Sequence, residues 1–62
     1  MRLVLFAIED SNTIAVNPGR VDAIRTFNGY TRIYAGDFYA DVTDNLPTVF
    51  EKLTKDDKQN ES

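Results

Sequence analysis

The chain contains no cysteine and no histidine, and these two absences exclude most of the common chemistry of protein sites. Without cysteine no disulfide bond can form, and without either residue type the usual zinc sites cannot form. Catalysis that depends on a cysteine nucleophile or a histidine base is excluded as well. The carboxylates show no pairing along the sequence that would suit acid–base work or metal binding. We therefore predict a protein that is not an enzyme and that uses no metal or cofactor.

Long hydrophobic runs are also missing. The apolar run at residues 3–8 is far shorter than the ~20 residues that a membrane-spanning helix needs, and no small-residue cleavage site follows it. The formal net charge of −3 leaves no excess of basic residues to neutralise the phosphates of duplex DNA. We therefore expect a cytoplasmic protein without a signal peptide, whose partners include neither a membrane nor duplex DNA.

The small size of the chain points to self-association. Its 62 residues suffice for one domain. A domain of this size buries only ~60% of the surface of its unfolded chain and is marginally stable without a disulfide, a metal or a partner chain. Because the first two stabilisers are excluded, we expect a homodimer or a larger homo-oligomer.

Residues 2–8 are predicted to form a strand that is apolar on both faces. One face carries Leu3, Leu5 and Ala7, and the other carries Val4, Phe6 and Ile8. Such a strand is either central in a layered structure or buried between subunits. Since so short a chain cannot cover both faces, we favour a strand at a subunit interface.

Two turn signals fix the register of the central part of the chain. Asn28-Gly29 predicts a hairpin with a type I′ turn, which pairs Phe27 with Tyr30 and Arg25 with Arg32. Gly36-Asp37 predicts a second hairpin, which pairs Tyr34 with Tyr39 and Arg32 with Asp41. The two turns agree on one apolar face of the sheet, which carries Ile24, Thr26, Thr31, Ile33, Phe38, Ala40 and Val42.

The segments on either side of these hairpins complete the fold. Residues 13–17 predict a further strand, which ends at Asn17-Pro18 in a bulge or a helical turn. The loop of residues 17–20 is a weak candidate for an anion cradle, and we favour a plain turn. Asn45 predicts the N-cap of a helix over residues 46–54, which would lay Val49, Phe50 and Leu53 across the apolar face.

These elements define the predicted fold class and domain organisation. We expect an α+β protein with one small antiparallel sheet of four to five strands and a single C-terminal helix on one face. The domain comprises residues 1–54, and the remaining residues, 55–62, contain no apolar side chain. Such a segment cannot bury enough surface to fold, so we expect a disordered charged tail.

The sheet face opposite the helix is the candidate functional site. We call it the arginine–aromatic face; it carries Arg25, Phe27, Tyr30, Arg32, Tyr34, Tyr39 and Asp41. Arginine matches the geometry of phosphate and carboxylate groups, and tyrosine rings stack on bases, so an anionic, nucleotide-like ligand or a partner protein could bind here. Two other interpretations stay open: a subunit interface, and a solvated surface on which arginine stems cover the rings.

A resemblance to a known family comes from residues spread over positions 14–53. They include Val16-Asn17-Pro18, Val21, Ile24, Thr31-Arg32-Ile33, Val42, Asp44-Asn45 and the segment 49–53. This pattern resembles the small β proteins of the flagellar FlbD-like type, and the resemblance implies a regulatory protein that acts only through protein–protein contacts. The Asn28-Gly29 turn and the arginine–aromatic face depart from that pattern.

A second likeness is one of size and style, without a defining motif. The chain is similar to small phage accessory proteins that bind and disable a host factor or signal. This likeness implies a phage-encoded, non-enzymatic homo-oligomer that sequesters or inhibits an anionic, nucleotide-like ligand or a host protein. We take this as the first hypothesis for function, with an FlbD-like regulatory role as the alternative.

Overall fold

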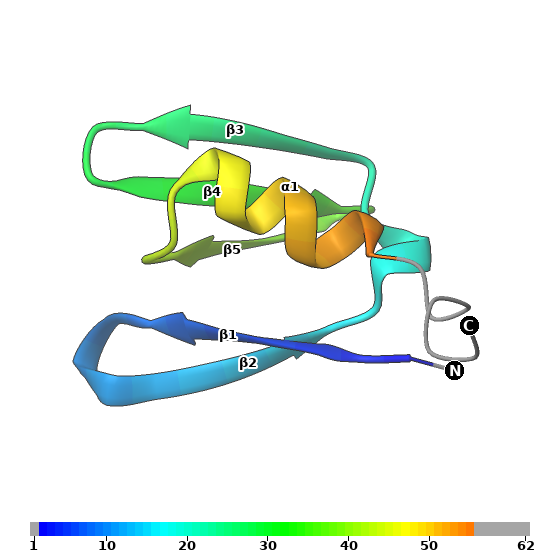
Figure 1. Ribbon diagram of the computed structural model, residues 1–62, viewed down its shortest axis with the longest axis horizontal. Helices are drawn as coiled ribbons and strands as arrows, with labels where there is room; N and C mark the ends of the chain where they lie inside the picture. Colours follow the sequence, from blue (N-terminus) through cyan, green and yellow to red (C-terminus); the bar gives the residue numbers. More distant parts are fainter. Residues whose placement is uncertain (1, 56–62) are drawn as a thin grey trace.

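The computed structural model describes residues 2–55, which form five strands, two 3₁₀ turns and one helix (Figure 1). The elements are β1 (Val4–Ile8), η1 (Glu9–Ser11), β2 (Asn12–Val16), η2 (Pro18–Arg20), β3 (Ala23–Phe27), β4 (Tyr30–Ala35), β5 (Phe38–Val42) and α1 (Leu46–Thr54). The α+β class, the antiparallel strands and the C-terminal helix are as predicted. Apart from Lys55, the predicted tail lies outside the described residues.

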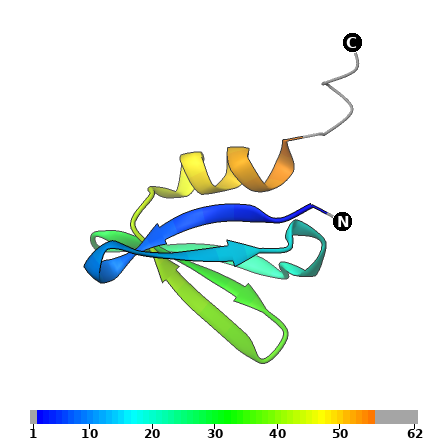
Figure 2. The same cartoon turned by 90° about the horizontal axis from the view of Figure 1, so that it is seen from below.

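The prediction of a single sheet is wrong, because the strands form two antiparallel sheets. One sheet is the β1–β2 hairpin and the other has the order β3-β4-β5. At their junction, the amide of Thr43 donates to the carbonyl of Ala7 at 3.0 Å, just beyond the end of β5. Figure 2 shows the hairpin crossing the strands of the larger sheet at an angle, so β1 and β5 separate beyond this point.

The larger sheet has the register predicted from its two turns. Arg25 pairs with Arg32, Arg32 with Asp41 and Tyr34 with Tyr39. The turn at Asn28-Gly29 is not the predicted type I′, however, because only Gly29 has a positive φ, of 93°. A negative φ followed by a positive one is the pattern of a type II turn, which requires glycine at the second central position.

Helix α1 has the predicted bounds, and its first turn explains why it begins there. The side chain of Asn45 accepts a hydrogen bond from the amide of Thr48 at 3.0 Å, and proline occupies the first turn. Val49 is fully buried and Leu53 is partly buried against the core. The placement of Phe50 was wrong: it is 57% exposed, since the buried stripe of the helix passes through the other two side chains.

The core lies between α1, the larger sheet and the inner face of the hairpin. It contains the buried apolar side chains of Phe6, Val16, Ile33, Val42 and Val49. Thr31 is also fully buried, and its hydroxyl donates to the carbonyl of Asp44 at 2.8 Å. Thr26 and Phe38 have the register predicted for this face, but both side chains are exposed.

The turn between β2 and β3 is helical, which decides between the two predicted alternatives. The side chain of Asn17 accepts from the amide of Gly19 at 2.9 Å, and the amides of Arg20 and Val21 donate to carbonyls of the same turn. These N–H groups are therefore used within the turn, as expected for a plain structural loop.

We predict that Thr31→Val destabilises the protein by about 1–2 kcal/mol, because it leaves the carbonyl of Asp44 without its buried donor. Urea unfolding followed by circular dichroism measures the change. Thr26→Val is the matched control, since Thr26 lies opposite Thr31 on the ladder but is exposed. Equal stability losses in the two variants would contradict the role assigned to the Thr31 hydroxyl.

Candidate functional site: the arginine–aromatic face

The structure brings all seven predicted site residues onto one face of the β3-β4-β5 sheet. β3 contributes Arg25 and Phe27, β4 contributes Tyr30, Arg32 and Tyr34, and β5 contributes Tyr39 and Asp41. Side chains alternate between the two faces of a strand, so the cross-strand pairing places these residues side by side, away from α1. Tyr39 is 53% exposed, whereas the rings of Phe27, Tyr30 and Tyr34 are partly covered by their neighbours.

Arg32 lies at the centre of the arginine–aromatic face and is held in place from several sides. Its Nε donates to Asp41 Oδ1 at 2.7 Å and its Nη2 donates to Asp41 Oδ2 at 3.1 Å. Its guanidinium carbon also lies 4.2 Å from the ring centroid of Tyr39 and 4.9 Å from that of Phe27. A bidentate pair flanked by two rings fixes both the position and the plane of the guanidinium.

This pairing changes the ionisation of both partners. The hydrogen bond from Arg32 holds the pKa of Asp41 below its ordinary value, and the positive charge of the guanidinium adds to that effect. The same hydrogen bond raises the pKa of Arg32 further above its ordinary value. Both groups are therefore fully charged at neutral pH and neutralise each other. This also relieves the repulsion expected between Arg25 and Arg32, which face each other across the ladder.

Arg25 has a different environment. Its guanidinium lies 4.9 Å from the ring centroid of Phe27, and its side chain is exposed on edge strand β3. It forms no ion pair within the described residues 2–55. The arginine–aromatic face thus carries a net charge of about +1, located at Arg25.

The rings themselves are arranged in two pairs. Phe27 and Tyr30 stack with centroids 5.1 Å apart and an interplanar angle of 9°. Tyr34 and Tyr39 lie 6.4 Å apart at 55°. Both contacts join residues that oppose each other on neighbouring strands, so the cross-strand register sets the spacing of the pairs.

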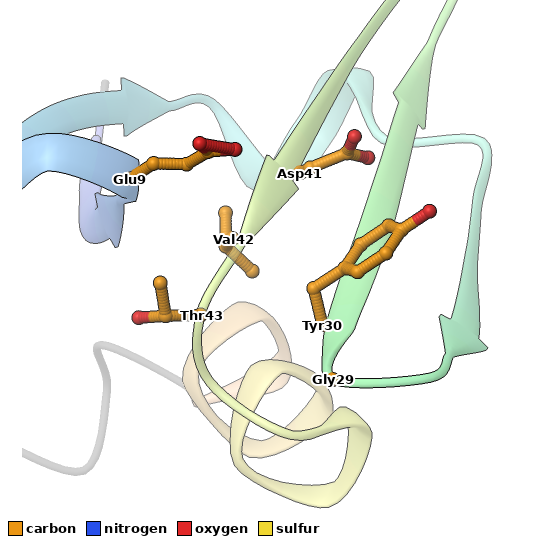
Figure 3. Close-up of a pocket in the computed structure, with 6 residues that line it drawn as sticks. All are labelled: Glu9, Gly29, Tyr30, Asp41, Val42 and Thr43. Carbon is orange, nitrogen blue, oxygen red and sulfur yellow. The ribbon is translucent and has the colours of Figure 1, made fainter.

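A hollow of about 440 Å³ borders the arginine–aromatic face at the outer edge of β5. It is lined by Glu9, Gly29, Tyr30, Asp41, Val42 and Thr43, and Figure 3 shows Glu9 reaching towards it from the end of the β1–β2 hairpin. Glu9 and Thr43 were not predicted to lie here, because only the contact between the two sheets brings them to this position. Its lining contains no cation, and its two carboxylates are Glu9 and Asp41, of which Asp41 is paired with Arg32, so the hollow offers no partner for a phosphate.

Two further classes of site receive no support from the described residues. Within residues 2–55, no group of three or more acidic side chains is placed to hold a metal ion. The one helix of the described region is too short to cross a membrane.

The comparisons with known proteins give no relative from which a function can be transferred. No protein-family model, no curated protein and no solved structure matches the chain. The resemblance to FlbD-like proteins therefore stays a prediction from the residues alone.

We predict that the Arg32–Asp41 pair makes stability depend on pH at the acidic end. Because the pKa of Asp41 is lowered in the folded state, the pair stabilises the fold above about pH 4, the unfolded aspartate value, and this contribution is lost as the pH falls further. Asp41→Asn should therefore destabilise the protein at neutral pH and have progressively less effect towards pH 2.

Urea unfolding of both proteins across this pH range measures the difference. Asp37→Asn is the control, because Asp37 is exposed in the β4–β5 turn and forms no ion pair within residues 2–55. If the effect of Asp41→Asn does not change with pH, the ion pair does not make the predicted contribution.

Proposed function

We propose that the protein is a non-enzymatic homo-oligomeric binding protein that holds an acidic target protein against the arginine–aromatic face and thereby inhibits it. The observation that carries this proposal is the fixed geometry around Arg32, whose guanidinium is held by Asp41 and by the rings of Tyr39 and Phe27. Side chains that are already ordered lose little conformational entropy when they bind, so such a surface is preorganised for binding a partner.

The composition of the arginine–aromatic face favours a protein as the target. Tyrosine, phenylalanine and arginine are enriched at protein–protein interfaces and supply most of their strong contacts. Arg25 would pair with a carboxylate of the target, since it has no ion pair within residues 2–55. The likeness to small phage accessory proteins suggests a host protein, and a regulatory role of the FlbD-like type would use the same surface.

A small anionic, nucleotide-like ligand is the second candidate, and one specific arrangement favours it. Arg25 lies 4.9 Å from the ring of Phe27, which itself stacks on Tyr30, so a base could stack beside a phosphate bound to Arg25. Arg32 adds little to such a site, because Asp41 already accepts two of its hydrogen bonds. The protein target therefore remains the first candidate.

We predict that Arg25→Glu weakens target binding by about tenfold or more, because it replaces the pairing cation with a repelling anion. Native mass spectrometry of the protein as purified from cells, before and after mild denaturation, identifies the bound target. Added mass of many kilodaltons indicates a protein, and a few hundred daltons indicates a nucleotide-like ligand. Titration with the identified target then measures the Kd of each variant.

Lys55→Glu is the matched control, since it makes the same change in charge at an exposed position beyond α1. It should bind like the wild type. Unchanged affinity in both Arg25→Glu and Tyr39→Ala would exclude the arginine–aromatic face as the binding surface.

A further inference from the structure

The outer face of the β1–β2 hairpin is a surface without charged side chains. We call it the hairpin face; it carries Leu3, Leu5, Ala7, Thr13, Ala15 and Asn17. Leu3 and Leu5 are 54% and 62% exposed, whereas Phe6, on the inner face of the same strand, is 1% exposed. None of these six positions carries a charged residue.

The shape of the hairpin face is complementary to itself. The large side chain of Leu3 lies at the open end of the hairpin, Leu5 lies in the middle, and the small side chain of Ala7 lies near the η1 end. A two-fold axis that lies in the plane of contact and perpendicular to the strands would stack the hairpin faces of two copies with opposite ends together. Leu3 of each copy would then meet Ala7 of the other, a large side chain above a small one, and Leu5 would meet Leu5 at the centre.

The two ends of the hairpin carry opposite charges, so the same two-fold axis would bring opposite charges together. The η1 end carries Glu9 and Asp10, and the open end leads into η2 with Arg20. Figure 1 shows that these two ends lie at opposite extremes of the hairpin. Arg20 is exposed and forms no ion pair within residues 2–55, so it is available to a carboxylate of a second copy.

A hollow at the open end provides room for this contact. It has a volume of about 260 Å³ and is lined by Ala15, Val16, Asn17, Arg20, Ala35 and Phe38. A two-fold axis that brings the η1 end of one copy to the open end of the other would place Asp10 of each copy near this hollow and its Arg20.

We propose that a second copy of this chain packs on the hairpin face, sheet against sheet and related by a two-fold axis. Two uncharged surfaces meet at the centre, and Asp10 pairs with Arg20 of the other copy at both ends. This inference rests on the self-association included in the proposed function, but it is independent of what binds to the arginine–aromatic face. It also accounts for a β1 that is apolar on both sides: the core covers one side and the second copy covers the other.

We predict that Leu5→Lys converts the dimer to a monomer or raises its dissociation constant at least about tenfold, because it buries a charge at the centre of the contact. Sedimentation velocity over a range of protein concentrations measures the state of association. Phe50→Lys is the matched control: Phe50 is 57% exposed on α1, away from the hairpin, and the variant should stay dimeric. Circular dichroism verifies that both variants are folded.

A double-mutant cycle tests the proposed orientation of the two copies. Arg20→Glu should weaken the dimer strongly in the wild-type background and much less when combined with Asp10→Asn, because the repelled carboxylate is then absent. Asparagine suits this position, since Asp10 has a positive φ of 62° and asparagine tolerates left-handed backbone. If Leu5→Lys does not fold, this cycle still tests the contact.

Three outcomes would overturn the proposal. They are a wild-type protein that is monomeric at high micromolar concentration, a dimer that survives Leu5→Lys, and a dimer that Phe50→Lys dissociates. These measurements need no target molecule. A result against the dimer can therefore be told apart from a result against the proposed function, which Arg25→Glu tests by target binding.

Discussion

The burial of Phe6 is the interaction on which the rest of the structure depends. Its side chain, 1% exposed, fills the space between the hairpin, the larger sheet and α1. Lys52 of α1 lies with its Nζ 4.7 Å from the ring centroid of Phe6 and donates to the carbonyl of Leu5 and to Asp44. The same part of β1 is therefore fixed to the helix by apolar packing and by hydrogen bonds to its outer edge.

The burial of Phe6 determines which strand faces are exposed to solvent. Side chains alternate along a strand, so turning Phe6 inward turns Leu3, Leu5 and Ala7 outward and creates the hairpin face. On the larger sheet, the requirement that Ile33 and Val42 face the core turns Arg32 and Asp41 outward. The two surfaces to which we assign binding roles both follow from the alternation of side chains around one small core.

The register and the helix could be predicted because local residues determine them. Glycine at Gly29 and Gly36 fixes the two turns, and Asn45 with Pro47 fixes the start of α1. The division into two sheets could not be predicted, because it depends on how β1 lies relative to β5. These strands are distant in the sequence and meet only where Thr43 donates to Ala7.

The same distinction applies to the candidate site. The seven residues of the arginine–aromatic face were found from the pairing of strands, and the proximity of Asp41 to Arg32 followed from it. The placement of the Arg32 guanidinium between Tyr39 and Phe27 depends on side-chain conformation, which the pairing does not fix. The lining of the neighbouring hollow by Glu9 requires the contact between the two sheets.

The two proposed surfaces would act together in a dimer. The proposed contact through the hairpin face would leave Arg25 and Tyr39 of each copy outside the contact, so a dimer would present two equivalent arginine–aromatic faces. A target with two matching sites would then be held more tightly than by one face, because the second contact forms within an already assembled complex. Self-association would thus contribute both to the stability of a small domain and to its affinity, since each dimer would carry two of the proposed binding surfaces.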